Sequence, residues 1–390
     1  MSFVLNRTFL APRNRLSSSS FQSHHPKVTK RSISSILHKS IIDKTPGQKT
    51  PQLKQDIDYA ICKVRKHDPA GFLPGFFLPP DGRAGYFAIR AFWVETGLRN
   101  TPIPIPSHQI QNTFTNRNTF QNVTPEERIQ FWRNGINSLY RDKTDALQEN
   151  DVSCIECHPV LRLLQYILNR HDLSHQHFRE VLDGRERDLH VKQYLTMDAF
   201  VQHSQQSCGN LLNLTLECLD IYNTRDSESF NNHYTINNSA HKAALDIGTC
   251  HGLTNGLRTA IPLVSNTGKI IIPQELCHKY DVRSPRYLLS ALGQGDAKCR
   301  NAFRYAVKDI ATEARKYLER ARKERQFILE QSNGERAIAS LLPGLTSETF
   351  LNRLELEEYN LTSKNLRQVG PLEHFLCATR VMRAWKNVKY

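Results

Sequence analysis

Residues 301–330 read NAFRYAVKDIATEARKYLERARKERQFILE, the longest stretch of the chain in which an apolar stripe recurs at helical spacing. Most neighbouring members of the stripe are three or four residues apart, so they share one face of an α-helix, and charged side chains occupy the other faces. The stripe consists of Phe303, Ala306, Val307, Ile310, Ala314, Tyr317 and Ala321. The pattern predicts a long amphipathic helix.

Helical patterns also fill most of the chain before this stretch. Residues 124–127, Thr-Pro-Glu-Glu, supply an N-cap, a proline at the first helical position and a capping glutamate. They predict the start of a helix whose inner face carries Ile129, Trp132, Ile136 and Leu139. Further helices are expected at residues 52–64, 81–98, 159–171, 174–183, 193–219 and 240–261.

Strand signals are almost absent from the sequence. Only Lys269–Ile272 has the β-branched character of a strand, and it is too short to build a sheet. Polar stretches interrupt the helices at residues 99–123, 222–239 and 331–335, and no repeat of 20 to 50 residues indicates a solenoid. The predicted fold class is therefore all-α, a single-domain helical bundle with polar loop insertions over residues 51–390.

Much of the formal charge of +14 lies at the N-terminus. Residues 1–42 contain no Asp or Glu, many serines and seven Lys or Arg, which leaves +7 on the rest of the chain. This composition is typical of a mitochondrial transit peptide, which we place at residues 1–50 as a disordered segment; a basic tail of a cytosolic or nuclear protein is the alternative. The remaining charge indicates ordinary solubility or weak attraction to anionic lipid or an acidic partner rather than nucleic-acid binding, and no apolar stretch is long enough to span a bilayer.

Two short patterns resemble metal or haem sites. Residues 154–158, Cys-Ile-Glu-Cys-His, match C-x-x-C-H, but no second zinc pair is present and a helical pattern follows at once, so we interpret the match as coincidence at a helix start. His171 and His175 have the spacing of a helical zinc pair, but Ser174 between them reads as an N-cap. The nine dispersed cysteines indicate reduced thiols, several of them buried.

Four blocks, in order along the chain, resemble the squalene/phytoene synthase family. They are DPAGFLPGFFLP at 68–79 followed by YFAIRAF at 86–92, VLDGRERDL at 181–189, GLTNGLR at 252–258 and GKIIIP at 268–273. The resemblance covers most of residues 55–325. It implies a helical bundle of the isoprenoid-synthase type across residues 51–390.

Active members of that family join two prenyl diphosphates head to head and need Mg²⁺ for this reaction. Two motifs hold the Mg²⁺, each with Asp residues four positions apart. At the first position this chain has Glu95 with Arg99 four residues on, and at the second it has TAIPL at residues 259–263, with no carboxylate. Without these carboxylate ligands, Mg²⁺ is not expected to bind at the site. The departure from the motifs implies a protein that is not an enzyme and that uses no cofactor.

One branch of the family, the mitochondrial complex I assembly factor 6 type, shows this same pattern. The segments AFWVE at 91–95, QFW at 130–132, DGRERD at 183–188, CHGL at 250–253 and LRTA at 257–260 resemble it. That likeness implies a mitochondrial matrix protein, peripheral to the inner membrane, that contacts complex I subunits or other assembly factors. The alternatives are an active head-to-head prenyltransferase using Mg²⁺ and prenyl diphosphates, and a haem or zinc protein.

Glu95, Asp183, Asp188 and Arg258 are the candidate residues of a residual cavity, which is a candidate site for a lipid or isoprenoid. Helix spacing also allows a simple ion pair between Glu95 and Arg99. Asp183 and Asp188, with arginines between them, fit a solvated helix end, and Arg258 fits either an anion site or a structural salt bridge. The basic run Lys316–Arg325 contains glutamates and fits a solvated helix face better than a membrane patch.

The leader generates the first prediction. Residues 1–50 fused to a reporter protein are expected to carry it into mitochondria and to be cleaved there, because the segment is basic, serine-rich and free of acidic residues in its first 42 positions. Fluorescence microscopy and the mass of the imported reporter measure this. A reporter that stays diffuse in the cytosol contradicts the targeting hypothesis.

Overall fold

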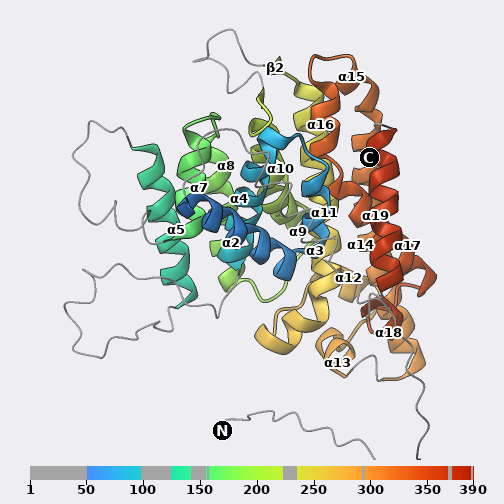
Figure 1. Ribbon diagram of the computed structural model, residues 1–390. Helices are drawn as coiled ribbons and strands as arrows, with labels where there is room; N and C mark the ends of the chain where they lie inside the picture. The colour runs from blue at the N-terminus through green and yellow to red at the C-terminus, as the bar shows by residue number, and fades with distance from the viewer. Residues whose placement is uncertain are drawn as a thin grey trace, which may run out of the picture.

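The structure, a computed structural model, describes residues 51–97, 124–141, 155, 158–222, 235–291, 295–367, 371–387 and 390. These residues form an all-α protein, which confirms the predicted fold class (Figure 1). Several predictions lie outside the described residues: the leader, the polar loop at 99–123, most of the insertion at 222–239, and the cysteines of the C-x-x-C-H match.

The first half of the chain forms the helices that Figure 1 shows on its left side. α2 packs on α4 and α7, and α5 packs on α8. The elements are α2 (Pro51–His67), α3 (Pro69–Phe72), η1 (Pro74–Phe76), α4 (Pro80–Gly97), α5 (Pro125–Tyr140), α7 (Pro159–Leu168) and α8 (His175–His190).

The second half begins with α9 (Met197–Ser204), a π-helical turn η3 (Gln205–Gly209) and α10 (Asn210–Glu217). Two-residue strands β1 (Ile221–Tyr222) and β2 (Thr235–Ile236) pair in parallel before the longest helix, α11 (Asn238–Thr267). The remaining helices are α12 (Gln274–Lys279), α13 (Pro285–Ser290), α14 (Ala297–Lys323), α15 (Arg325–Leu329), α16 (Gly334–Ser340), α17 (Pro343–Leu356), α18 (Lys364–Arg367) and α19 (Pro371–Lys386).

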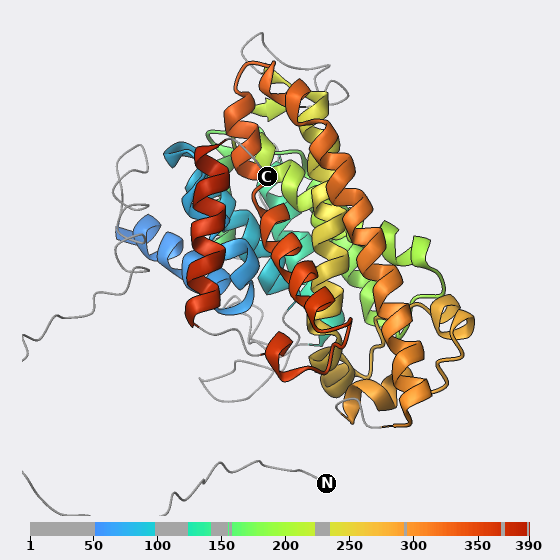
Figure 2. The ribbon, with the colours of Figure 1, turned by 90° about the vertical axis from the view of Figure 1, so that its right-hand side faces the viewer.

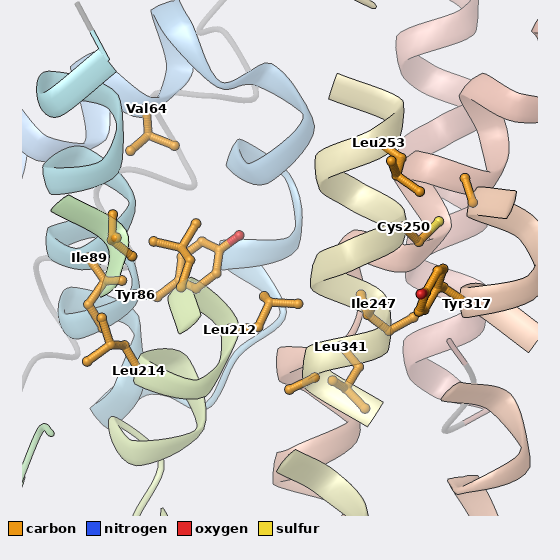
Figure 3. Close-up of a cluster of buried hydrophobic side chains, with 14 of the residues drawn as sticks. Val64, Tyr86, Ile89, Leu212, Leu214, Ile247, Cys250, Leu253, Tyr317 and Leu341 are labelled. Atoms are coloured by element: carbon orange, nitrogen blue, oxygen red, sulfur yellow. The ribbon is translucent and has the colours of Figure 1, made fainter. Parts of the chain in front are cut away.

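α11 lies between two groups of helices of the second half. It packs on α9, η3 and α10 on one side and on α14 and α17 on the other, and Figure 2 shows α11 (yellow) beside α14 (orange). Figure 3 shows the buried core on both sides, with Tyr86 of α4 near Leu212 of α10, and Ile247 and Cys250 of α11 facing Tyr317 of α14. Burial of these apolar faces is the main stabilising term of the bundle.

Local signals in the sequence account for several helix ends. Thr124 and Glu127 form the expected capping box at the start of α5, and Ser174 is the residue that precedes α8. His158 is the N-cap of α7, where its Nδ1 accepts a hydrogen bond from the amide of Val160 at 3.2 Å. The predicted helix start at this histidine is confirmed.

Three sequence expectations differ from the structure. The helix expected at 193–219 starts only at Met197, because Gln193 bridges to Ile270 and Thr196 caps α9. The helix expected at 174–183 continues to His190. The segment with strand character at 269–272 contributes only that one bridge, as expected for a segment too short to build a sheet. α11 continues through Pro262 to Thr267, six residues past the expected end, and stops at Gly268, whose φ of 71° is the left-handed conformation that glycine favours at a helix C-terminus.

A row of glycines on α11 lets it approach α9 and η3 closely. A Cβ added to Gly248 would lie 2.5 Å from the backbone of Gly209, and one added to Gly252 would lie 2.6 Å from Cβ of Ser204. Larger side chains at these two positions would therefore push the helices apart. The close contact holds the π-helical turn against the centre of α11.

A buried polar network ties α3, α4, α11 and α17 together. Arg90, fully buried on α4, donates from Nη1 to Oδ2 of Asp68 at 2.9 Å, and the same nitrogen lies 3.5 Å from Nε2 of His251. Burial lowers the pKa of His251 well below its usual value, so the ring is neutral and its Nε2 accepts. Its Nδ1 then carries the proton and donates to Oγ of Ser347 at 3.1 Å.

This network generates the second prediction. Arg90→Met should lower the free energy of unfolding by about 3–5 kcal/mol, because it leaves the buried Asp68 carboxylate without its partner. Denaturant titration measures the loss. The double variant with Asp68→Asn should regain part of it, since Asn keeps the capping contact to the amide of Gly71 without the charge. An Arg90→Met protein as stable as the wild type contradicts this account.

Candidate functional site

A cavity of about 460 Å³ lies between α4, α5, α8, α9, η3 and α11. Its wall combines apolar side chains with several charged ones, a composition common in small-molecule sites. Trp93, Val94, Ile129, Leu189, Phe200, Leu263 and Ile271 supply most of the apolar surface.

One face of α11 forms a long part of the wall. Gly252, Asn255, Gly256, Thr259 and Leu263 line the cavity, and apart from the adjacent Asn255 and Gly256 they follow one another at intervals of three or four residues. Thr259 and Leu263 therefore occupy the two positions, one turn apart, at which the family resemblance places metal-binding aspartates. Neither side chain carries a charge, so these two positions supply no carboxylate for a divalent cation.

Asp188, near the end of α8, also lines the cavity and is already paired. Its Oδ1 lies 2.6 Å from Nζ of Lys269 and accepts from the Tyr194 hydroxyl at 2.8 Å, and its Oδ2 lies 3.3 Å from Nε2 of His203. Although burial opposes it, these neighbours hold the pKa of Asp188 below its usual value. Asp188 is thus a buried, partnered carboxylate, which corrects the interpretation of a solvated helix end for this residue.

The second carboxylate of the described wall is Asp68, which the buried Arg90 neutralises. His203, the neighbour of Asp188, is neutral as well, since burial lowers its pKa to about 4. The two described carboxylates of the cavity wall, Asp68 and Asp188, are therefore each paired with a cationic side chain of the protein.

Glu95 does not line the cavity, which corrects the expectation from the sequence. It is buried and turned toward α2, where Tyr59 donates to its Oε1 at 2.6 Å and Nζ of Lys63 lies 2.7 Å away. Burial raises its pKa, but the contacts to Lys63 and Tyr59 outweigh burial and keep it below the usual value. Arg99, its expected partner, lies outside the described residues.

Asp183 is also absent from the cavity wall. It is half-exposed and lies 2.8 Å from Nη1 of Arg133 on α5. Five residues on a helix turn the side chain by about 140°, so Asp183 and Asp188 face different sides of α8. The interpretation of a solvated helix end therefore fits Asp183 but not Asp188.

Arg258 lines the cavity and makes no ion pair with any described carboxylate. Its Nη2 donates to the carbonyl of Thr346 at 2.7 Å, its Nη1 donates to Oδ1 of Asn255 at 3.1 Å, and its guanidinium stacks 4.7 Å from the ring centre of Phe350. Burial lowers the pKa of Arg258 to about 10, so the group remains charged at neutral pH. The structure thus holds a cation at the wall with neutral partners.

Arg128 is a cavity residue that sequence analysis missed. Its side chain is buried at 2% exposure, and its Nε and Nη1 have no hydrogen-bond partner among the described residues. Burial lowers the pKa of Arg128, and the nearby negative charge of Glu95 opposes this shift. The sequence did contain a signal, because Arg128 lies four residues before Trp132 and so belongs to the inner face of α5.

The donor set does not fit the Mg²⁺ that the family resemblance implies. Among the described residues no group of three or more His, Cys, Asp or Glu side chains converges on one point. The two wall carboxylates are each bound to a protein cation, and the arginines oppose a further positive charge. We therefore derive no chemical step through a metal ion.

Other candidate residues have structural partners. His171 lies 3.0 Å from Asp220, and Nε2 of His175 lies 3.0 Å from Oδ1 of Asn137 on α5, so the two histidines serve separate contacts. In the basic run, Arg320 binds Asp246 and Arg322 binds Glu319 and Glu348. In the part of the chain that is described, no helix is both long and apolar enough to cross a membrane.

The comparison with family descriptions matches squalene/phytoene synthase over residues 64–372. The chain belongs to the squalene/phytoene synthase family. Two solved structures of the family show the fold: a dehydrosqualene synthase with a TM-score of 0.58 at 16% identity, covering 86% of this chain and 98% of that one, and squalene synthase HpnC from Alicyclobacillus acidocaldarius with a TM-score of 0.55 at 14% identity, covering 82% and 99%.

The similar curated proteins are named as assembly factors, whereas the two solved structures are named as synthases. The chain is 24% identical to "NADH dehydrogenase (ubiquinone) complex I, assembly factor 6" of Bos taurus, over 84% of this chain and 82% of the relative. The human protein of that name is 24% identical over 80% and 78%, and the homolog from Drosophila melanogaster is 25% identical over 79% and 78%. The resemblance drawn from the sequence blocks is confirmed.

The unpartnered arginine generates the third prediction. Arg128→Met should raise the free energy of unfolding by about 1–2 kcal/mol, because methionine fills the space without burying a guanidinium whose Nε and Nη1 lack acceptors. Thermal unfolding followed by circular dichroism measures the change.

Arg133→Met is the matched control on the same helix. Arg133 is paired with Asp183 and Glu186, both largely exposed, so its loss should lower stability by no more than about 1 kcal/mol. A clear loss of stability in Arg128→Met, with Arg133→Met unchanged, would show that Arg128 is a satisfied structural residue.

Proposed function

We propose that this chain is a catalytically inactive member of the squalene/phytoene synthase family that assists the assembly of complex I in mitochondria. The observation that carries the proposal is the neutral pair Thr259 and Leu263 on the cavity face of α11. Departure of a diphosphate from a prenyl chain needs compensation of the negative charge that develops on the leaving group. A wall without free carboxylates cannot recruit the metal ions for that task.

The relatives support the assembly role. Proteins from Bos taurus, Homo sapiens and Drosophila melanogaster that are named complex I assembly factor 6 or its homolog align with this chain over most of their own length. An assembly factor works through its surface, so loss of the metal ligands inside the fold is compatible with that role. The partners in this proposal are complex I subunits or other assembly factors.

The proposed location is the mitochondrial matrix, against the inner membrane. Two observations support it: the acid-free, basic leader at residues 1–42, and the name of the relatives, since complex I is a mitochondrial enzyme. Attachment at the membrane surface would use protein contacts or anionic lipid, because the chain outside the leader retains a formal charge of +7.

The fourth prediction separates an assembly factor from an enzyme. Purified protein with Mg²⁺ and farnesyl or geranylgeranyl diphosphate should yield no squalene or phytoene by chromatography, with an active squalene synthase as the positive control. Deletion of the gene should lower assembled complex I on native gels and leave sterols and carotenoids unchanged.

Rescue of the deletion provides the internal control. Glu95→Gln should restore complex I, because Glu95 contacts α2 rather than the cavity and glutamine can still accept from Tyr59. Prenyl coupling that Glu95→Gln abolishes, together with normal complex I in the deletion strain, would contradict the proposal and favour an active prenyltransferase.

A further inference from the structure

Two large apolar side chains lie exposed on the last turns of α19. Trp385 is 45% exposed and Met382 is 40% exposed, and they are three positions apart, so they are neighbours on the helix surface. Among the described residues with large, exposed apolar side chains, only these two belong to the same helix. The ring of Trp385 also packs on Phe77, 5.8 Å away between ring centres, so the apolar surface continues from α19 to the end of η1.

The fold already uses another side of α19. Val381 is fully buried in a small cluster with Leu342 and Leu345, and Cys377 and Ala384 pack against this cluster. Figure 1 places α19 at the right-hand margin of the molecule, and Figure 2, which turns that side to the viewer, shows α19 (red) with no other described helix in front of it. α19 is thus a helix on the outside of the bundle that keeps a second apolar surface in contact with solvent.

Cations without partners flank this second surface. Arg383 and Lys386 are exposed, and no described carboxylate lies within ion-pair distance of either. Arg380, one turn earlier, differs because its Nη2 forms an ion pair with Glu348. The sequence from 377 to 387 contains no Asp or Glu. The end of α19 therefore combines an apolar strip with positive charge that the protein does not neutralise.

We propose that this end of α19 is a membrane-contact surface that binds a bilayer containing anionic lipid. Tryptophan beside basic side chains is typical of helices that lie in the interface of a bilayer, with the ring among the head groups and the cations near lipid phosphates. The inference rests on the proposed location at the inner membrane and names the surface that makes the contact.

Two features favour a bilayer over a protein as the occupant. A helix on the outside of a bundle is a convex ridge, which a fluid bilayer can follow without a preformed groove. A protein interface that buries a charge needs a matching group at a fixed position, whereas mobile head groups neutralise exposed cations wherever they lie. The exposed Arg383 and Lys386 suit the second case.

Vesicle binding by the full chain tests this surface. The vesicles contain about three parts phosphatidylcholine to one part cardiolipin, with phosphatidylcholine alone as the comparison, and sedimentation measures the bound fraction. We expect at least about twentyfold stronger binding to the anionic vesicles, at roughly fivefold for each of two cations. The difference should shrink as salt is added, because salt screens exposed charges.

The basic leader also attracts anionic lipid, so a second measurement reports on α19 alone. Phosphatidylcholine brominated in its acyl chains should quench the fluorescence of Trp385 in the bound protein. Trp385→Phe should lose most of this quenching and stay bound, because Trp132 is fully buried and Trp93 lines the cavity.

Variants assign the side chains. Arg383→Gln combined with Lys386→Gln should weaken binding to the anionic vesicles by about twentyfold, and Met382→Gln should weaken it by about fivefold. All three positions are exposed, so the melting temperature should stay that of the wild type. Leu195→Gln is the matched control, because Leu195 is 68% exposed on the segment between α8 and α9, and this variant should bind like the wild type.

Several results would overturn the inference. Equal binding to phosphatidylcholine alone would refute recognition of anionic lipid, and bound protein with unquenched Trp385 would place the contact elsewhere, the leader included. Unchanged binding in the Arg383→Gln, Lys386→Gln chain would remove the assigned residues. A chain that binds no vesicles, but whose double variant fails to restore complex I in the deletion strain, would show that α19 docks a protein. Normal complex I in the deletion strain refutes the assembly role instead, and the vesicle result then stands by itself.

Discussion

The buried ion pair between Arg90 and Asp68 is the interaction on which the centre of the molecule depends. It joins the short helix α3 to α4, and through His251 and Ser347 it reaches α11 and α17, so segments more than 250 residues apart share one hydrogen-bonded chain. Nε and Nη2 of Arg90 have no hydrogen-bond partner among the described residues, so the network depends on the contacts of Nη1. Loss of the ion pair would leave a charge alone in the interior, which is costly.

The same pair shapes the electrostatics of the cavity. Asp68 reaches the wall but its charge is balanced by Arg90, which fixes the carboxylate and leaves it little capacity to bind a cation. Lys269 does the same for Asp188. With the uncharged Thr259 and Leu263 on α11, each described carboxylate of the cavity wall is paired with a cation of the protein.

Local sequence signals predicted much of the fold. The capping box at Thr124, the helix start at His158 and the long stripe from residue 301 depend on neighbours in the chain, so pattern and structure agree there. The start of α9 and the course of α11 beyond Pro262 depend on tertiary contacts that periodicity does not contain. A one-dimensional pattern of apolar residues cannot show which helix will pack against another.

The site was harder to predict for the same reason. Motif spacing placed Thr259 and Leu263 correctly on one face of α11. Glu95, in contrast, contacts Lys63 and Tyr59 on α2, and no local sequence pattern predicts that contact. Arg128 was overlooked because an arginine early in a helix usually faces solvent. Only the packing of α5 shows that this one is buried without a partner.

The described cavity wall has no carboxylate left to hold a divalent cation, since Asp68 and Asp188 are paired and Thr259 and Leu263 are uncharged. Electron paramagnetic resonance of Mn²⁺, titrated into the full chain with and without inorganic diphosphate, tests this, since Mn²⁺ binds the oxygen ligands that hold Mg²⁺. We expect no protein-bound Mn²⁺ under either condition beyond what diphosphate alone binds. Stoichiometric binding of Mn²⁺ that Thr259 and Leu263 variants do not affect but Asp188→Asn abolishes would contradict it.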